Sequence, residues 1–174
     1  MERFVAFWAG LVLSASVVAE DFLVEVQVDV QRGCMLVDAQ REAGAQVLGR
    51  IDLGRPARLD GPGGPVSGVL LSSRPPRLEC NPDTTYQVRV DGGQHGGVGE
   101  LRYLASNGAK TRPIPYRLYQ DAAWRKPLPV GVAQAARVPG SGSVELPLYA
   151  RIDSLEWVPR AGLYADLLKV TVTW

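Results

Sequence analysis

The chain has 174 residues, of which 46% are apolar, 21% charged and 7% aromatic, and this length predicts one domain with one substantial core. Nineteen Lys and Arg residues balance eighteen Asp and Glu residues, so no global field favours nucleic acid or an acidic membrane surface as a partner. One histidine and two cysteines exclude metal sites built from Cys and His clusters and leave little material for His-dependent acid–base chemistry.

The first nineteen residues have the pattern of a secretory signal peptide. An unbroken run of apolar or small residues extends from Phe4 to Leu13, and small or slim residues stand before Glu20, where a signal peptidase needs them. The alternative is an uncleaved membrane anchor, but residues 4–19 are fewer than the ~20 that cross a bilayer. We therefore expect residues 1–19 to be removed on export, with no membrane span in the mature chain.

Residues 22–30 alternate strictly between apolar and mostly polar side chains. This alternation predicts an extended strand with one apolar edge. Periodicity alone favours a strand that packs on its own domain, as most N-terminal strands do. The apolar set is Phe22, Val24, Val26, Val28 and Val30, and the intervening set is Leu23, Glu25, Gln27 and Asp29.

Cys34 and Cys80 are the two cysteines of the chain. In an oxidising compartment they predict a single intramolecular disulfide, and two separate buried thiols are the alternative. Closing the loop between them is worth about 4 kcal/mol in the chain-entropy model.

The rest of the chain predicts short strands separated by Gly- and Pro-rich turns. Residues 38–47 carry no continuous apolar stripe and are expected to form a loop or a single turn, while residues 54–76 form a long connection that holds one buried strand. Short alternating strands of this kind indicate an all-β, antiparallel β-sandwich. The alternating runs lie at 86–90, 114–118, 144–152 and 164–174.

No catalytic constellation can be assembled from the polar residues, and we expect no enzyme activity, no metal and no cofactor. His95 lies in a Gly-rich stretch that lacks the Lys-Ser or Lys-Thr of a phosphate loop, and Ser141 and Ser143 lack the glycines of a nucleophile elbow. Asp121 and Asp166 are expected to serve turns or caps rather than glycoside hydrolysis.

Several motifs in order resemble the spore coat U domain family, whose members include subunits of archaic (Csu-type) chaperone-usher pili. The resemblance covers nearly all of residues 20–174. One departure is Leu53-Gly54, where the family usually shows Phe-Gly, and a leucine can fill the same core position. The matching pieces are Val26–Val30 with Gly33-Cys34, Leu78-Glu79-Cys80, Tyr86–Gly93, Ile114–Asp121, Ala161–Asp166 and Val170–Trp174.

The resemblance implies an immunoglobulin-like sandwich, incomplete because its final strand is missing, with a donor strand at its N-terminus. Residues 20–33 would form the donor extension and residues 34–174 the pilin domain. The apolar set Phe22, Val24, Val26, Val28 and Val30 would insert into a neighbouring subunit. The acceptor groove would be lined by the C-terminal edge strand, through Tyr164, Leu168, Val170, Val172 and Trp174.

The function implied is that of a structural pilus subunit, exported to the periplasm and then displayed at the cell surface, where it supports adhesion or biofilm formation. Its partners would be a periplasmic chaperone, an outer-membrane usher and neighbouring subunits of a homo- or heteropolymer. The alternative is a secreted monomeric β-sandwich that binds carbohydrate or another surface ligand, with its N-terminal strand in its own sheet. Trp124 and Trp157 are expected to be core or rim aromatics rather than carbohydrate platforms.

Overall fold

The computed structural model describes residues 25–37, 40–42, 45–72, 74–106 and 111–174. The chain divides into two units, Met1–Val30 and Gln31–Trp174, and the second is called the body below. The expected signal peptide, together with Phe22 and Val24 of the expected donor strand, lies outside the described residues.

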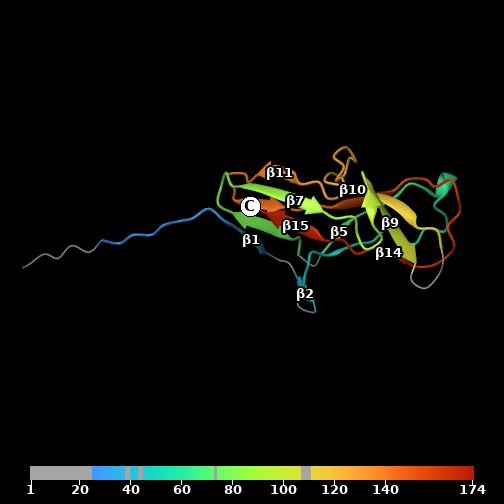
Figure 1. Cartoon of the computed structure of the whole chain (residues 1–174), viewed down its shortest axis with the longest axis horizontal. Coiled ribbons are helices and arrows are strands. Elements are labelled where there is room, and N and C mark those ends of the chain that lie inside the picture. Colours follow the sequence, from blue (N-terminus) through green and yellow to red (C-terminus); the bar gives the residue numbers. More distant parts are fainter. Residues whose placement is uncertain (1–24, 38–39, 43–44, 73, 107–110) are drawn as a thin grey trace, which may run out of the picture. The chain divides into compact units, whose positions relative to one another are not determined.

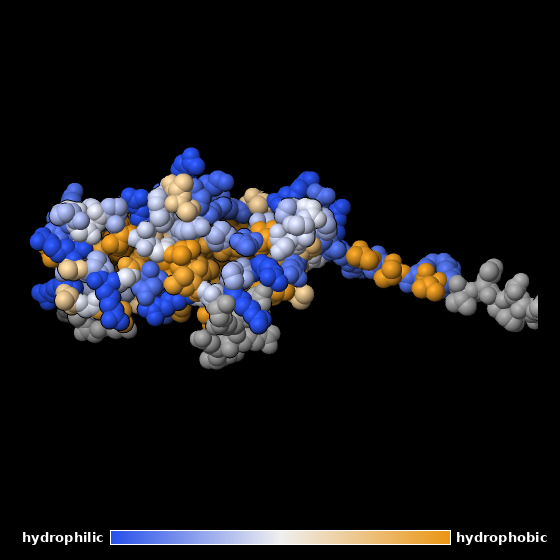
Figure 2. Space-filling model, turned by 180° about the vertical axis from the view of Figure 1, so that it is seen from behind, coloured by the Kyte–Doolittle hydropathy of each residue, from blue (hydrophilic) through white to orange (hydrophobic). Residues whose placement is uncertain are grey.

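Residues 25–30, the described part of the first unit, belong to no helix or strand. Val26, Val28 and Val30 are 89%, 87% and 72% exposed, and Figure 2 shows such apolar side chains between polar ones along this segment. The side-chain amide of Gln27 donates a hydrogen bond to the Glu25 carboxylate, so these two polar side chains share one side. The alternation predicts a strand here; the segment has the side-chain pattern of one but no ladder.

The body consists of short antiparallel strands, and its one helix among the described residues is a single 3₁₀ turn, Gly61–Gly63 (Figure 1). The all-β class with antiparallel pairing, predicted from the alternating runs, is confirmed. The strands are β1 (Cys34–Val37), β2 (Gln40–Glu42), β3 (Ala45–Val47), β4 (Arg50–Ile51), β5 (Val66–Leu71), β6 (Arg77–Cys80), β7 (Thr85–Val90), β8 (Gly97–Val98), β9 (Leu101–Ser106), β10 (Ile114–Tyr119), β11 (Gln134–Arg137), β12 (Ser143–Glu145), β13 (Tyr149–Ile152), β14 (Tyr164–Ala165) and β15 (Val170–Thr173).

The strands form one large sheet, two three-stranded sheets and a hairpin. The large sheet has the order β14-β9-β10-β13-β5-β4, with β8 paired to β9. The three-stranded sheets have the orders β1-β6-β12 and β11-β7-β15, and the hairpin is β2-β3. Among the described strands, β1, β4, β14 and β15 therefore all lie at sheet edges.

Two clusters of buried apolar residues fill the body. The first, core one, includes Ile114, Tyr116 and Leu118 from the inward face of β10. The second, core two, consists of Leu78, Tyr86 and Val138, with the Cys34–Cys80 pair packed against it. Leu53 is half-buried against core one, which is the position that the sequence comparison expected it to fill.

Three elements differ from the prediction for physical reasons. The run 144–152 divides into β12 and β13 around Pro147, which has no amide to donate to a ladder. Residues 38–47 contain the β2-β3 hairpin instead of a loop or single turn, because strands of three residues are too short to carry a readable period. Strand β5 is not fully buried. Its residues alternate between half-buried and exposed, because one side of the strand packs on the body and the other faces solvent.

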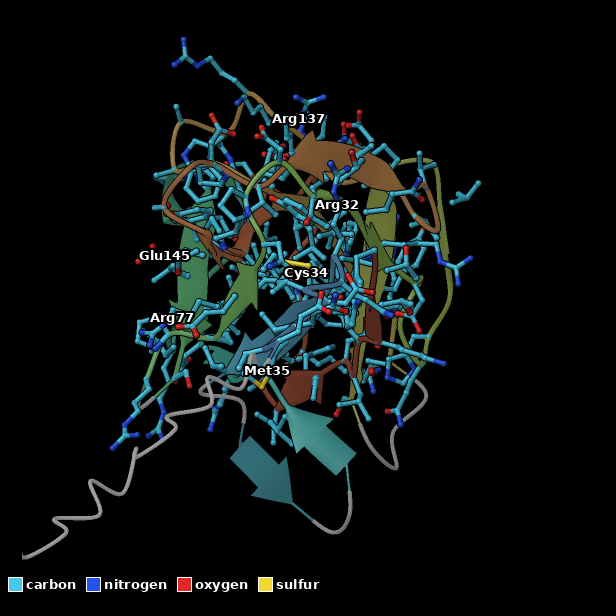
Figure 3. All side chains as sticks on the ribbon, turned by 90° about the vertical axis from the view of Figure 1, so that its left-hand side faces the viewer. Arg32, Cys34, Met35, Arg77, Arg137 and Glu145 are labelled. Atoms are coloured by element: carbon cyan, nitrogen blue, oxygen red, sulfur yellow. A yellow bond between two sulfur atoms is a disulfide. The ribbon has the colours of Figure 1, made fainter. Side chains whose placement is uncertain are left out.

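The predicted disulfide between Cys34 and Cys80 is present, and the two residues are direct register partners in β1 and β6. Their Cα atoms lie 4.0 Å apart, and Figure 3 shows the disulfide at Cys34; both cysteines are half-buried. Two further bonds hold the chain just before β1: the Gly33 amide donates to Asn81 Oδ1 over 2.9 Å and the Asn81 amide donates to the Gly33 carbonyl over 3.1 Å. The start of the body is thus fixed to β6 by covalent and polar contacts together.

Replacing both cysteines (Cys34→Ser with Cys80→Ser) is expected to lower the unfolding free energy by about 4 kcal/mol, because the unfolded chain regains the freedom of the closed loop. Chemical denaturation of the full chain measures the loss, and reduction of the wild type should reproduce it. Equal denaturation midpoints for the double variant and the oxidised wild type would contradict a stabilising disulfide.

Candidate functional site

The C-terminal run, residues 164–173, provides an edge strand to two different sheets. Its first part, β14, is the last strand of the large sheet and pairs only with β9 among the described strands. Its second part, β15, is the last strand of the β11-β7-β15 sheet and pairs only with β7 there. The opposite side of the run thus has no neighbouring strand within the described residues.

Hydrogen bonding shows which backbone groups of β15 remain available. The Asp91 amide donates to the Lys169 carbonyl over 3.1 Å, and the ladder continues from Val170 opposite Val90 to Thr173 opposite Gln87. Alternate residues of an antiparallel strand direct their backbone groups to the same neighbour. Lys169, Thr171 and Thr173 therefore face β7, whereas the amides and carbonyls of Val170 and Val172 face the open side.

The side chains of the run cover parts of both cores. Tyr164, Leu168 and Val170 are half-buried against core one, and Val172 is half-buried against core two. Trp174 follows on the same side by the period of two but is 59% exposed. The structure thus brings four of the five residues expected to line an acceptor groove into one row along the cores, and leaves Trp174 at the exposed end of that row.

A second pair of edges borders the same two cores. Cys34 in β1 packs against core two and Ile51 in β4 packs against core one, and both strands end their sheets. Figure 2 shows apolar side chains gathered in the middle of one face of the body, between polar rims. Partly exposed apolar side chains beside strand edges that have no second neighbour in the described part of the chain are a site that can accept an added strand with an apolar face.

The Asp166 carboxylate forms hydrogen bonds that fix the segment between β14 and β15. Asp166 accepts hydrogen bonds from the Tyr116 hydroxyl (2.7 Å), the Gln94 amide (2.8 Å) and the Leu167 amide (3.0 Å). Gly93 has a φ of +76°, and a Cβ there would lie 2.0 Å from Asp166 Oδ2. The close approach of the Gly-rich loop to Asp166 thus requires glycine, and it fixes the point where the run changes sheets.

Burial raises the pKa of the Tyr116 hydroxyl strongly, and its hydrogen bond to Asp166 raises it further. The hydroxyl therefore stays protonated and donates to the carboxylate. The charge of Asp166 is thus held at the core side of the run by neutral donors.

Arg102, on β9, is fully buried and lies beside this break. Its guanidinium donates to the carbonyls of Asp91 (2.8 Å), Leu128 (2.9 Å) and Val90 (3.2 Å). Burial lowers the pKa of Arg102, and the nearby carboxylates of Asp91 and Asp166 act against that shift. The side chain joins β9 to the end of β7, the strand on which β15 is paired.

Arg102 was missed by the sequence reasoning because its strand gives no signal of its burial. In Leu101–Ser106, the more apolar row is Leu101, Tyr103 and Ala105, and a period of two therefore predicts that Arg102 faces solvent. Its burial and its carbonyl acceptors are seen only in the structure.

The other candidates from the sequence have local roles. The Asp121 carboxylate accepts the backbone amides of Arg125 and Lys126 at 3.0 and 2.8 Å, which is a turn role, and His95 is exposed. In the described part of the chain no cluster of His, Cys, Asp and Glu residues could hold a metal ion. Nor does any described helix have the length and apolar character needed to cross a membrane.

The two tryptophans considered above lie against other side chains. Trp124 packs edge-on against Tyr119 and Tyr149, at centroid distances of 5.5 and 6.0 Å, with the Arg151 guanidinium over its ring. Trp157 is half-buried against core one. The Arg112 guanidinium lies 4.7 Å from the centroid of the Trp157 ring.

Comparison with known proteins finds a sequence family and several solved structures of low sequence identity. The family described as Spore Coat Protein U domain matches residues 20–171. The complex of the chaperone CsuC with the tip adhesion subunit CsuE, from archaic chaperone-usher Csu pili of Acinetobacter baumannii, is 18% identical with a TM-score of 0.49. That match covers 83% of this chain and 40% of the other.

The second structure is a chaperone–tip adhesin complex of CFA/I fimbriae, 17% identical with a TM-score of 0.45. The match covers 71% of this chain and 40% of that chain, so the chain spans well under half the length of both matched chains. None of the curated proteins matches the sequence.

The Arg102→Met substitution is expected to lower the unfolding free energy by about 3 kcal/mol, because buried carbonyls lose their donors. The Val90 carbonyl keeps the Gly131 amide as a donor, so the loss falls mainly on the carbonyls of Asp91 and Leu128. The control Arg125→Met, at an exposed position, should change stability by less than about 0.5 kcal/mol. Equal denaturation midpoints for the two variants would disprove the role assigned to Arg102.

Tyr116 is expected to make the body less stable in alkali. Because its pKa is raised on folding, its contribution is complete below the unfolded pKa of about 10 and is lost as the pH rises above it. In that range the wild type should lose about 1.4 kcal/mol more per pH unit than Tyr116→Phe. Denaturant titrations at several pH values measure both slopes, and parallel curves through the alkaline range would refute the prediction.

Proposed function

Because the chain belongs to the Spore Coat Protein U domain family, we propose that it is a non-enzymatic structural subunit of a surface pilus assembled by the chaperone-usher pathway. The observation that carries this proposal is the position of the C-terminal run. It provides the edge strand of two sheets, and its apolar side chains cover two cores only in part. Such an edge recruits a strand from another chain unless it is covered.

The proposed occupant of this edge is the N-terminal strand of a neighbouring subunit. Val26, Val28 and Val30 are exposed and spaced two residues apart, and the alternation extends back to Phe22 and Val24. A strand with this pattern supplies backbone partners for Val170 and Val172 and apolar side chains for the cores in the same movement. The body would thereby complete an immunoglobulin-like sandwich that lacks its final strand.

The free energy expected from burial of the donor strand is large enough for a long-lived contact between subunits. Five buried apolar side chains contribute on the order of 8–15 kcal/mol before ordering costs. This range matches the stability of a whole domain. Once formed, a subunit contact of this kind would dissociate very slowly.

The geometry of donation leads to a filament. Each copy gives its extension, residues 20–33, to one neighbour and accepts another extension with its domain, residues 34–174. A contact between two different surfaces of the same chain does not close on itself and so propagates. In this role the chain would support adhesion or biofilm formation at the cell surface.

Before donation, the open edge needs protection. We assign that part to a periplasmic chaperone, which would pair one of its own strands with the run until an outer-membrane usher passes the subunit to the growing fibre. This order requires export, for which residues 1–19 would serve as a cleaved signal peptide. After cleavage the subunit would be held in the fibre by strand pairing alone, with no membrane span, cofactor or metal.

Deletion of residues 22–30 is expected to abolish polymerisation. The mature chain, with and without these residues, is exported together with a periplasmic chaperone, and detergent-resistant, heat-labile ladders are then followed by gel electrophoresis. Ladders are expected only from the full chain, because the deletion removes the apolar strand and leaves the edge unfilled. Equal ladders from both forms would disprove the assignment of residues 22–30 as the donor strand.

A composition-matched variant separates the pattern of the extension from its mere presence. Exchanging Val26 with Gln27 and Val28 with Asp29 keeps every residue type but moves two apolar side chains to the other side of the strand. This variant should form few or no ladders, although its length and charge are unchanged. Wild-type polymerisation by this variant would show that alternation does not matter.

A further inference from the structure

The sheet that ends in β15 carries positive charge beside the open edge. Strands β7, β11 and β15 contain no acidic residue, and their outward side includes Arg89, opposite Thr171 in the register. Lys169 lies one step before β15 on the same side. Both cations are exposed, and neither forms an ion pair with another described residue.

The other charged side chains near Arg89 and Lys169 already have hydrogen-bond or ion-pair partners. The carboxylate of Asp91, which lies opposite Lys169, accepts the backbone amides of Gly93 (3.0 Å) and Lys169 (2.9 Å). Arg137, two strands from the edge, pairs with Asp83 at 3.6 Å. Among the described residues, Arg89 and Lys169 are therefore the two cations without an ion-pair partner that an added strand would meet at this edge.

The extension of this chain carries the opposite charge. Residues 20–33 contain four acidic residues and one basic residue, Arg32, which follows the last valine of the alternating segment. Two of the acids, Glu25 and Asp29, stand between the valines, and the bond from Gln27 to Glu25 shows that side chains of this intervening row share one side. When the valines turn toward a core, this row turns outward.

The pairing geometry brings the two rows together. Residues directly opposite in an antiparallel pair have side chains on the same face, so valines opposite Val170 and Val172 place Glu25, Gln27 and Asp29 opposite Lys169, Thr171 and Thr173. With either Glu25 or Asp29 opposite Lys169, an ion pair forms directly. With Gln27 there, Glu25 stands opposite Thr171, within reach of Arg89 across that threonine.

We propose that Arg89 and Lys169 form a selection surface for the acidic extension of a second copy of this chain, so that the subunit links preferentially to itself. This inference rests on the proposed strand donation and adds the identity of the donor. Opposite charges at an interface rim act mainly on the association rate and on the choice of partner. Linkage between copies should therefore slow as salt concentration rises, although burial of the valines is unaffected.

Charge reversal on both sides tests the proposal in the full chain, exported with its chaperone as above. The acceptor variant carries Arg89→Glu with Lys169→Glu, and the donor variant carries Glu25→Lys with Asp29→Lys. Each variant alone is expected to link about tenfold or more slowly than the wild type. Copies of the two variants, carrying tags of different size and produced together, should form mixed links at close to the wild-type rate.

Two controls make the outcome decisive. Arg125→Glu with Lys126→Glu imposes the same charge change on exposed residues of the turn after β10 and should leave the rate unchanged; disulfide formation and the circular dichroism spectrum check folding of every variant. Wild-type rates for either reversed variant, or failure of the mixture to restore linkage, would overturn the selection surface. If the charge-reversed variants link at the wild-type rate while deletion of residues 22–30 still abolishes ladders, strand donation is supported and charge selection is disproved.

Discussion

The unpaired side of the C-terminal run is the constraint on which the rest of the molecule depends. Val170 and Val172 direct their backbone groups away from β7, while their side chains cover one core each. A partner for this site must satisfy amides and carbonyls at a spacing of two residues and add apolar surface at the same spacing. Only an extended segment with alternating side chains meets both demands, so the edge itself defines the chemistry of its occupant.

A body whose cores are partly exposed at one strand edge needs stabilising contacts elsewhere. The Cys34–Cys80 bond joins β1 to β6 beside core two, and Arg102 joins β9 to the end of β7 beside core one. Asp166 fixes the point where the run leaves one sheet for the other through Tyr116 and Gln94. These contacts fix the strands beside the open edge, so that a strand added there would pair with a preformed edge at a lower ordering cost.

The all-β class, the disulfide and the longer strands could be predicted because each leaves a local signal: an alternation over five or six residues, or two cysteines in an exported chain. The β2-β3 hairpin could not, since three-residue strands show no period. Division of the run 164–174 between two sheets was also hidden, because it depends on Asp166 meeting Tyr116, 50 residues away in sequence. Tyr164, Leu168, Val170 and Val172 could be placed in one row from periodicity, but the buried acceptors of Arg102 are known only from tertiary structure.

In the proposed strand donation, the alternation in the extension would separate two tasks of a single strand. Its apolar row would supply burial, which is large and nearly independent of salt, but every subunit with a similar row would be held about equally well. Its intervening row stays in water, where charges add little to affinity and act instead on encounter and on mismatched partners. If the extension is the donor strand, a chain whose edge bears Arg89 and Lys169 and whose extension bears Glu25 and Asp29 would have the residues that hold the neighbour and the residues that select it on opposite sides of one strand.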